Sequence, residues 1–230
     1  MHRVGTARDR IQDNHFKTME LREFIDREGR CVIPESVKEI GDCAFDGCAG
    51  LKSVRIPASV KRIGDEAFRR CASLTSIKIP DGVEEIGSFA FAECSGLTAI
   101  DIPAGVAKIE ELTFAHCTGL ESVCIPDSVK EIECSAFIGC TGLKSVSIPS
   151  GVTVIGESAF EGCTGLTSVE IPDSVTQIWR YAFQGCTGLI SAHVPDSVAD
   201  IGECVFHGCT ALTENNVPED GRGKLMDLPF

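Results

Sequence analysis

Serine, histidine and glutamate residues that could cooperate in catalysis occur near position 190. Ser191 and His193 are two residues apart, and Glu170 precedes His193 by 23 residues, the interval at which this chain repeats. Such a trio activates a hydroxyl nucleophile only within an enclosed pocket that has an oxyanion hole, and an open sheet supplies neither. We therefore predict that the protein is not an enzyme and uses no cofactor. An enzyme that uses the sheet face around His193 is the weakest alternative.

Cysteine is the other residue type with chemical potential, and the chain has 13 of them. Eight recur every 23 residues, from Cys48 to Cys209. In parallel strands ~4.8 Å apart such neighbours point the same way, whereas a disulfide needs Cβ atoms ~3.8 Å apart and directed at each other. We expect these eight to be reduced and packed in the core. The other five form no CxxC motif or zinc spacing, so we expect no metal site: Cys31, Cys43, Cys124, Cys134 and Cys204.

The cysteine interval belongs to a repeat that runs through most of the chain. Prolines recur every 23 residues from Pro34 to Pro218 without insertion or deletion. Counted from each proline, the third residue is valine, the sixth isoleucine, the eleventh phenylalanine, the fourteenth cysteine and the seventeenth leucine in all eight units. This regularity predicts a solenoid, in which like side chains form ladders through one continuous core. The phenylalanines are Phe45, Phe68, Phe91, Phe114, Phe137, Phe160, Phe183 and Phe206.

The pattern LxSVxIPxSVxxIGxxAFxGC resembles the BspA-type leucine-rich repeat over residues 31 to about 218. The resemblance implies a curved, right-handed horseshoe with a parallel sheet on its concave side. It also implies binding or adhesion rather than catalysis, without indicating a ligand or any functional residue.

Local sequence signals divide each repeat into three segments, of which residues 149–171 are an example. The β-branched residues at 166–171 predict a strand, and the proline that follows ends its pairing. The return begins at Val152 and Ile155, where a second short strand is one interpretation. ESAFEG at 157–162 predicts one or two helical turns closed by a left-handed glycine. The predicted fold class is therefore α/β, a right-handed leucine-rich-repeat solenoid with short helical turns or strands on the convex side.

The repeat also sets the predicted domain boundaries. Residues 1–15 are charged and aperiodic and predict a disordered start. Apolar residues at helical spacing make 16–30 a predicted helical cap, with a partner-binding helix as the alternative. Residues 31–217 form the solenoid of eight repeats, and 218–230 follow as a tail or a cap.

The chain is acidic, with a net charge of −13 and a pI near 4.8. This charge argues against binding to nucleic acid or anionic membranes, where basic residues must neutralise phosphate. No segment approaches the ~20 apolar residues that cross a bilayer, so we expect no membrane insertion. The polar start lacks the apolar core of a signal peptide, which predicts a cytoplasmic protein. If the chain has been shortened from a longer precursor, a cell-surface or secreted location is expected instead.

Two surfaces are candidates for contact with a partner. On the concave sheet the outward residues are small and polar and lack large aromatic anchors, so the expected partner is a protein or peptide, with a solvated sheet as the alternative. This candidate concave surface consists of Arg55, Lys78, Asp101, Cys124, Ser147, Glu170 and His193.

The second candidate is an apolar patch on the otherwise polar edge, formed by Phe89, Leu112, Trp179 and Tyr181. Exposed aromatic groups can mark an interface, and local packing is the alternative. We predict a monomer or weak self-association. The predicted function is a protein-interaction scaffold, with a surface adhesin or structural spacer as the alternative.

Overall fold

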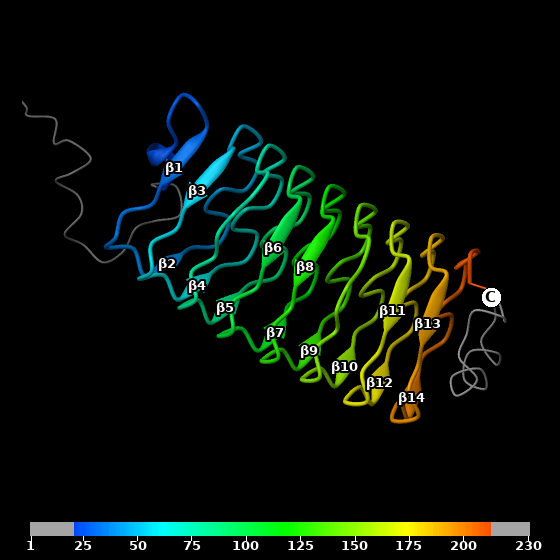
Figure 1. Ribbon diagram of the computed structural model, residues 1–230. Helices are drawn as coiled ribbons and strands as arrows, with labels where there is room; N and C mark the ends of the chain where they lie inside the picture. Colours follow the sequence, from blue (N-terminus) through cyan, green and yellow to red (C-terminus); the bar gives the residue numbers. More distant parts are fainter. Residues whose placement is uncertain (1–20, 213–230) are drawn as a thin grey trace, which may run out of the picture.

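The structure is a computed structural model that describes residues 21–212 as an elongated stack of coils (Figure 1). Each 23-residue repeat makes one coil, and we number the coils from the one that begins at Pro34. The predicted start at 1–15 and the predicted tail or cap at 218–230 lie outside the described residues.

One side of the stack carries three-residue strands, and we call it the long-strand face. It is the side predicted to be concave. Its strands pair in parallel with an offset of one repeat, as in Cys31↔Val54 and Val169↔Ala192. The sheet consists of three separate pairs, β1–β3, β6–β8 and β11–β13, so the predicted sheet is interrupted. The strands are β1 (Arg30–Val32), β3 (Ser53–Arg55), β6 (Ala99–Asp101), β8 (Ser122–Cys124), β11 (Ser168–Glu170) and β13 (Ser191–His193).

A second side, the short-strand face, carries one two-residue strand per coil, where the sequence favours a short return strand. These strands also pair in parallel, as in Ile155↔Ile178, and form a three-stranded and a five-stranded sheet. The strands are β2 (Glu39–Ile40), β4 (Arg62–Ile63), β5 (Glu85–Ile86), β7 (Lys108–Ile109), β9 (Glu131–Ile132), β10 (Val154–Ile155), β12 (Gln177–Ile178) and β14 (Asp200–Ile201).

The predicted helical turns are wrong, and so is the α/β class: the fold is a parallel-sheet β-solenoid. Within residues 21–212 the one helix is η2 (Leu21–Phe24), a 3₁₀ helix. Gly162 (φ 70°) is left-handed as predicted, but Ser158 (φ 54°) inside the segment 157–162 is left-handed too, which an α-helix does not tolerate. The N–H groups of Ser158, Phe160 and Gly162 donate to carbonyls of the next coil at 2.7–3.1 Å. Hydrogen bonds between coils therefore use the donors that a helix would need.

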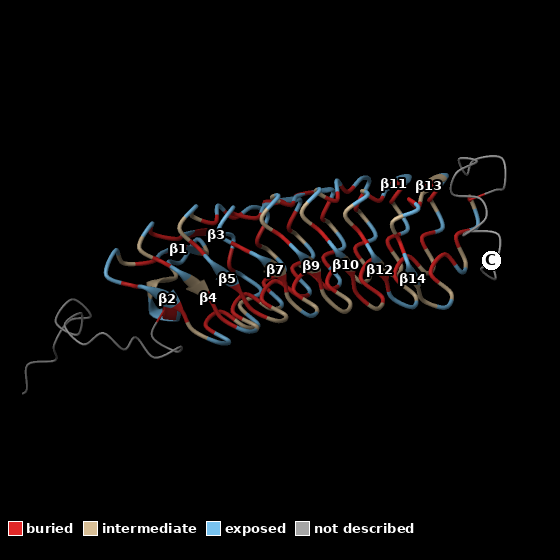
Figure 2. Cartoon of the chain, turned by 90° about the horizontal axis from the view of Figure 1, so that it is seen from below, coloured by how far each residue is buried: buried red, intermediate tan, exposed pale blue. Residues whose placement is uncertain are grey.

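The phenylalanines form a continuous stack of rings along the axis of the solenoid. All seven successive pairs, from Phe45 to Phe206, have centroids 5.1–5.6 Å apart and planes within 12° of parallel. Every ring is fully buried, and Figure 2 shows buried segments recurring at the same places in each coil. The expectation that like residues line up through one core is confirmed.

The cysteine column lies beside the rings. Cys71, Cys94, Cys117, Cys140, Cys163 and Cys186 are fully buried, and all the cysteines are free thiols. The exception is Cys48, which was expected in the core but is only half-buried, because it lies in the first coil.

Candidate functional site

The long-strand face presents one row of side chains that point away from the core. Its strands are exposed at both ends and buried in the middle, as in Ser53–Arg55, so the last residue of each strand faces outward. The structure brings all seven predicted residues of the candidate concave surface into this row, one per coil. Six are exposed and His193 is half-buried. We call this set the outer row: Arg55, Lys78, Asp101, Cys124, Ser147, Glu170 and His193.

Open grooves run beside the outer row, along the edge where each strand meets the following proline. One groove is lined by Arg55, Lys78 and Asp81, and the next by Lys78, Asp81 and Asp101. Asp81 was not among the predicted site residues, although the 23-residue repeat could have identified its position. It lies one residue after its proline, a position that holds Asp or Glu in five of the eight repeats.

A third groove lies further along the outer row. Ser147, Glu170 and Asp127 line it, together with Ser145 and Ser168. Its polar lining is hydroxyl and carboxylate, and the rest is apolar, as at Val146 and Ile148. Asp127 again comes from the position after a proline, which the sequence prediction did not include. The grooves are thus open, and polar and apolar side chains alternate along them.

Charges along the outer row are mostly not neutralised by neighbours. Arg55 contacts Glu35 at 3.1 Å, whereas Lys78, Asp101 and Glu170 make no ion pair with any residue that the structure describes. The row is basic in its first two coils and acidic further along. Charged groups that lack an internal partner are available to an external one.

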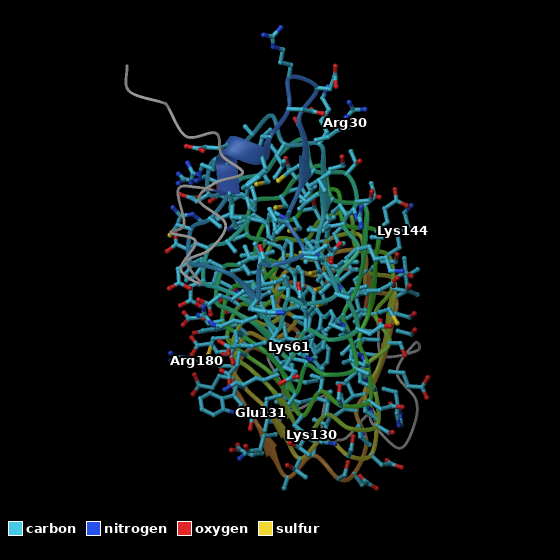
Figure 3. All side chains as sticks on the ribbon, turned by 90° about the vertical axis from the view of Figure 1, so that its left-hand side faces the viewer. Arg30, Lys61, Lys130, Glu131, Lys144 and Arg180 are labelled. Carbon is cyan, nitrogen blue, oxygen red and sulfur yellow. The ribbon has the colours of Figure 1, made fainter. Side chains whose placement is uncertain are left out.

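The short-strand face is different, because four of the six charged residues in its strands form ion pairs with described residues. Arg62 contacts Glu85 at 2.9 Å, and Lys108 contacts Glu133 at 2.6 Å. The hydrogen bond to Glu133 raises the pKa of Lys108. Seen along the stack, labelled charged side chains such as Lys144 and Arg180 lie at the periphery of the coils (Figure 3). This contrast between the two faces favours the long-strand face as the candidate binding site.

The trio that could have supported catalysis lies on an open surface. Glu170 and His193 are register partners in β11 and β13, and Ser191 lies opposite Ser168 in the same pair of strands. The groove lined by Glu170 is open to solvent, and nothing there encloses a substrate. In the described part of the chain no three His, Cys, Asp or Glu residues are placed to hold a metal ion. No helix within 21–212 has the length and apolar composition to span a membrane.

The predicted edge patch is divided into two parts. Phe89 and Leu112 lie in the third and fourth coils, and Trp179 and Tyr181 lie in the seventh. Phe89, Leu112 and Tyr181 are half-buried and left-handed, with φ of 56–62°. Trp179 is 49% exposed. The serines Ser135 and Ser158 hold the ninth position in the coils between the two parts.

The part of the patch around Trp179 has a defined setting. The Arg180 guanidinium lies 5.9 Å from the Tyr181 ring centroid, and its Nε contacts Glu157 at 2.9 Å. Glycine holds the seventh position in the coils on both sides, at Gly156 and Gly202. A Cβ atom at Gly202 would collide with the main chain of Trp179 and Arg180. Trp179 thus stands between two coils that have no side chain at its position.

In-register parallel coils with a leucine, isoleucine and valine core define a leucine-rich-repeat solenoid. A family model described as the BspA type leucine rich repeat region matches residues 9–144 and 130–222, in six copies. The chain belongs to this family, as its sequence pattern predicts.

Solved structures agree with this assignment. A leucine rich cell surface protein from Faecalibacterium prausnitzii is 33% identical, with a TM-score of 0.56, over 90% of this chain and 64% of its own. A leucine rich repeat protein from T. pallidum is 28% identical, with a TM-score of 0.59, over 89% and 85%. One from Eubacterium ventriosum is 27% identical, with a TM-score of 0.57, over 80% and 44%. This chain therefore spans less than two thirds of the first and third structures. No curated protein matches it.

Proposed function

We propose that the protein is a non-enzymatic scaffold that binds another protein or peptide on its long-strand face. The observation that carries the proposal is the contrast between the two faces. Most charges on the short-strand face pair with one another, whereas Lys78, Asp101 and Glu170 in the outer row make no ion pair with a described residue. A partner that supplies opposite charges would gain ion pairs without breaking any within the scaffold.

The order of charges defines the partner that fits. Acidic groups of an extended segment would lie over Arg55 and Lys78, and basic groups over Asp101 and Glu170. The hydroxyl groups of Ser147 and Ser145 lie between the charged ends of the row and can bond to a main chain. Large anchors are few on this face, so a single contact is expected to be weak.

A second candidate is adhesion at a cell surface, with several weak contacts acting together. The similarity to a protein described as a leucine rich cell surface protein favours it. The same outer row would then bind, and the location would determine how many copies act at once.

A charge-reversal experiment tests the proposed face. The probes are immobilised extended peptides of acidic, basic and neutral composition. The variant Arg55→Glu with Lys78→Glu is compared with Lys61→Glu with Lys130→Glu, which changes the charge equally on exposed residues outside the outer row. We expect the first variant to lose binding to acidic peptides by about tenfold or more, and the control to keep it. Equal loss in both variants, or no binding of any peptide class, would refute the proposal.

A further inference from the structure

Three main-chain hydrogen bonds close every junction between successive coils in the same way. The N–H groups of the ninth, eleventh and thirteenth residues of one coil donate to the carbonyls of the eighth, tenth and twelfth residues of the next. Between coils five and six, for example, Phe137 donates to Ala159 at 2.8 Å and Gly139 to Glu161 at 2.7 Å. We call this row of bonds the turn ladder. All its donors point toward the C-terminal end of the stack, so its two ends differ chemically.

The N-terminal end of the turn ladder offers three carbonyls, and Arg22 occupies two of them. Its Nε atom donates to the carbonyl of Ala44 at 2.9 Å, and its Nη2 atom donates to those of Cys43 at 2.9 Å and Asp46 at 3.0 Å. Ala44 and Asp46 hold the tenth and twelfth positions, whose carbonyls accept from a preceding coil elsewhere in the ladder. The guanidinium thus donates where the main chain of a preceding coil donates elsewhere in the ladder.

The C-terminal end of the turn ladder offers donors instead. These are the N–H groups of Cys204, Phe206 and Gly208 in the eighth coil. Within residues 21–212 no acceptor contacts any of the three. Phe206 is fully buried, and an unpaired main-chain donor at a buried residue is unfavourable. The end therefore requires a row of carbonyl acceptors spaced as in a further coil.

We propose that residues 226–230 of the same chain dock on this end and supply those acceptors. Every paired donor in the turn ladder bonds to the residue 22 positions later, as in Phe183 to Val205 at 2.9 Å. The same offset from Cys204, Phe206 and Gly208 leads to the carbonyls of Met226, Leu228 and Phe230.

The sequence of the docking segment suits a final coil. Pro229 holds the eleventh position, where all eight described coils have a phenylalanine and the first seven donate from it to the next coil. Proline has no N–H, so this segment can accept bonds from the eighth coil but cannot pass the central bond on. Leu228 holds the tenth position, which faces the core in the described coils, as Ala182 does. Such a segment would end the solenoid and cover an edge that could otherwise pair with another chain.

A second copy is a poorer occupant. If two C-terminal ends met through the turn ladder, donors would face donors. Two of the three N-terminal carbonyls are occupied by Arg22. A segment attached to the same chain also has a far higher effective concentration than a separate molecule.

Amide hydrogen exchange on the full chain tests the proposal with two matched variants. Leu228→Asp puts a charge at the core-facing tenth position. Leu225→Asp puts the same charge at the seventh position, where Trp179 lies exposed. We expect the Phe206 amide to be protected in the native chain, to exchange about tenfold faster or more in Leu228→Asp, and to be unchanged in Leu225→Asp. The Phe183 amide should stay protected in all three, which shows that the last coils remain folded.

Three outcomes would overturn the proposal. The first is fast exchange of the Phe206 amide in the native chain. The second is equal protection in both variants. The third is protection that rises with protein concentration together with dimers in light scattering, which would make a second copy the occupant.

Discussion

The Sγ atom of Cys140 donates a hydrogen bond to the main-chain carbonyl of Phe114, 3.1 Å away in the preceding coil. The same carbonyl oxygen also accepts the N–H of Cys117 at 3.2 Å, so the thiol donates to the second lone pair of that oxygen. The contact recurs from Cys71 to Cys209 at 3.0–3.2 Å. The cysteine column is therefore both apolar packing and a series of donors between coils.

Replacing Cys140 by alanine should remove this donor and leave a small cavity. We expect the free energy of unfolding to fall by about 1–3 kcal/mol, measured by urea titration. Cys124→Ala is the control, since Cys124 is exposed on the outer row and should change stability by less than about 0.5 kcal/mol. Equal effects of the two substitutions would show that the thiol bond contributes nothing.

Position along the ring stack should determine the cost of losing a ring. Phe137 stacks on both neighbours at 5.2 Å, whereas among residues 21–212 Phe206 stacks on Phe183 alone, at 5.4 Å. Phe137→Ala should destabilise the protein by about 3–5 kcal/mol, and Phe206→Ala by less. Guanidinium chloride titrations of both variants measure these two losses in the free energy of unfolding. Equal losses would mean that the last coil is as tightly packed as the middle.

Stability should fall at alkaline pH because of the buried thiols. Burial raises the pKa of Cys163 to about 12, and it also raises those of Cys117 and Cys140. An unfolded thiol ionises near pH ~8.5, so above that pH the unfolded state binds fewer protons than the native state. The stability that the buried neutral thiols contribute is fully present below about pH 8.5 and is lost as the pH rises toward 12.

Urea titrations across this pH range measure the effect. The fall in the free energy of unfolding should be shallower in Cys163→Ala and unchanged in Cys124→Ala. An identical pH slope in native protein and Cys163→Ala would contradict the assignment to buried thiols.

Arg22 should stabilise the first coil specifically. Arg22→Ala removes three hydrogen bonds to main-chain carbonyls, and we expect a loss of about 1 kcal/mol with faster amide exchange in the first coil. Arg27→Ala serves as the control, because Arg27 is exposed and contacts no described residue through an ion pair. If both variants exchange alike, the guanidinium does not close this end.

The repeat made the stack and its core predictable, because a fixed 23-residue interval can place like residues in contact only when coils lie in register. The turns were not predictable in the same way. Ser158 and Tyr181 are left-handed without being glycine, and composition gives no signal for that. Alanine and phenylalanine next to them suggested a helix, and hydrogen bonds to the next coil determined the conformation instead.

The candidate surface was predicted in part. Strand alternation alone placed Lys78 and Glu170 in one outward row. It could not show which charges have partners, since Arg62 and Lys78 look alike in sequence and only one of them pairs. The contribution of Asp81 and Asp127 to the grooves depends on how the turn after the proline folds back beside the row.

Trp179 is the only tryptophan of the chain, and its half-exposed indole lies between two coils with glycine at its position. Its fluorescence therefore reports a single site on the seventh coil rather than the interior. Emission should already be red-shifted in the native protein and should change little on denaturation. A blue shift on mixing with a candidate ligand would show directly that this edge has become covered.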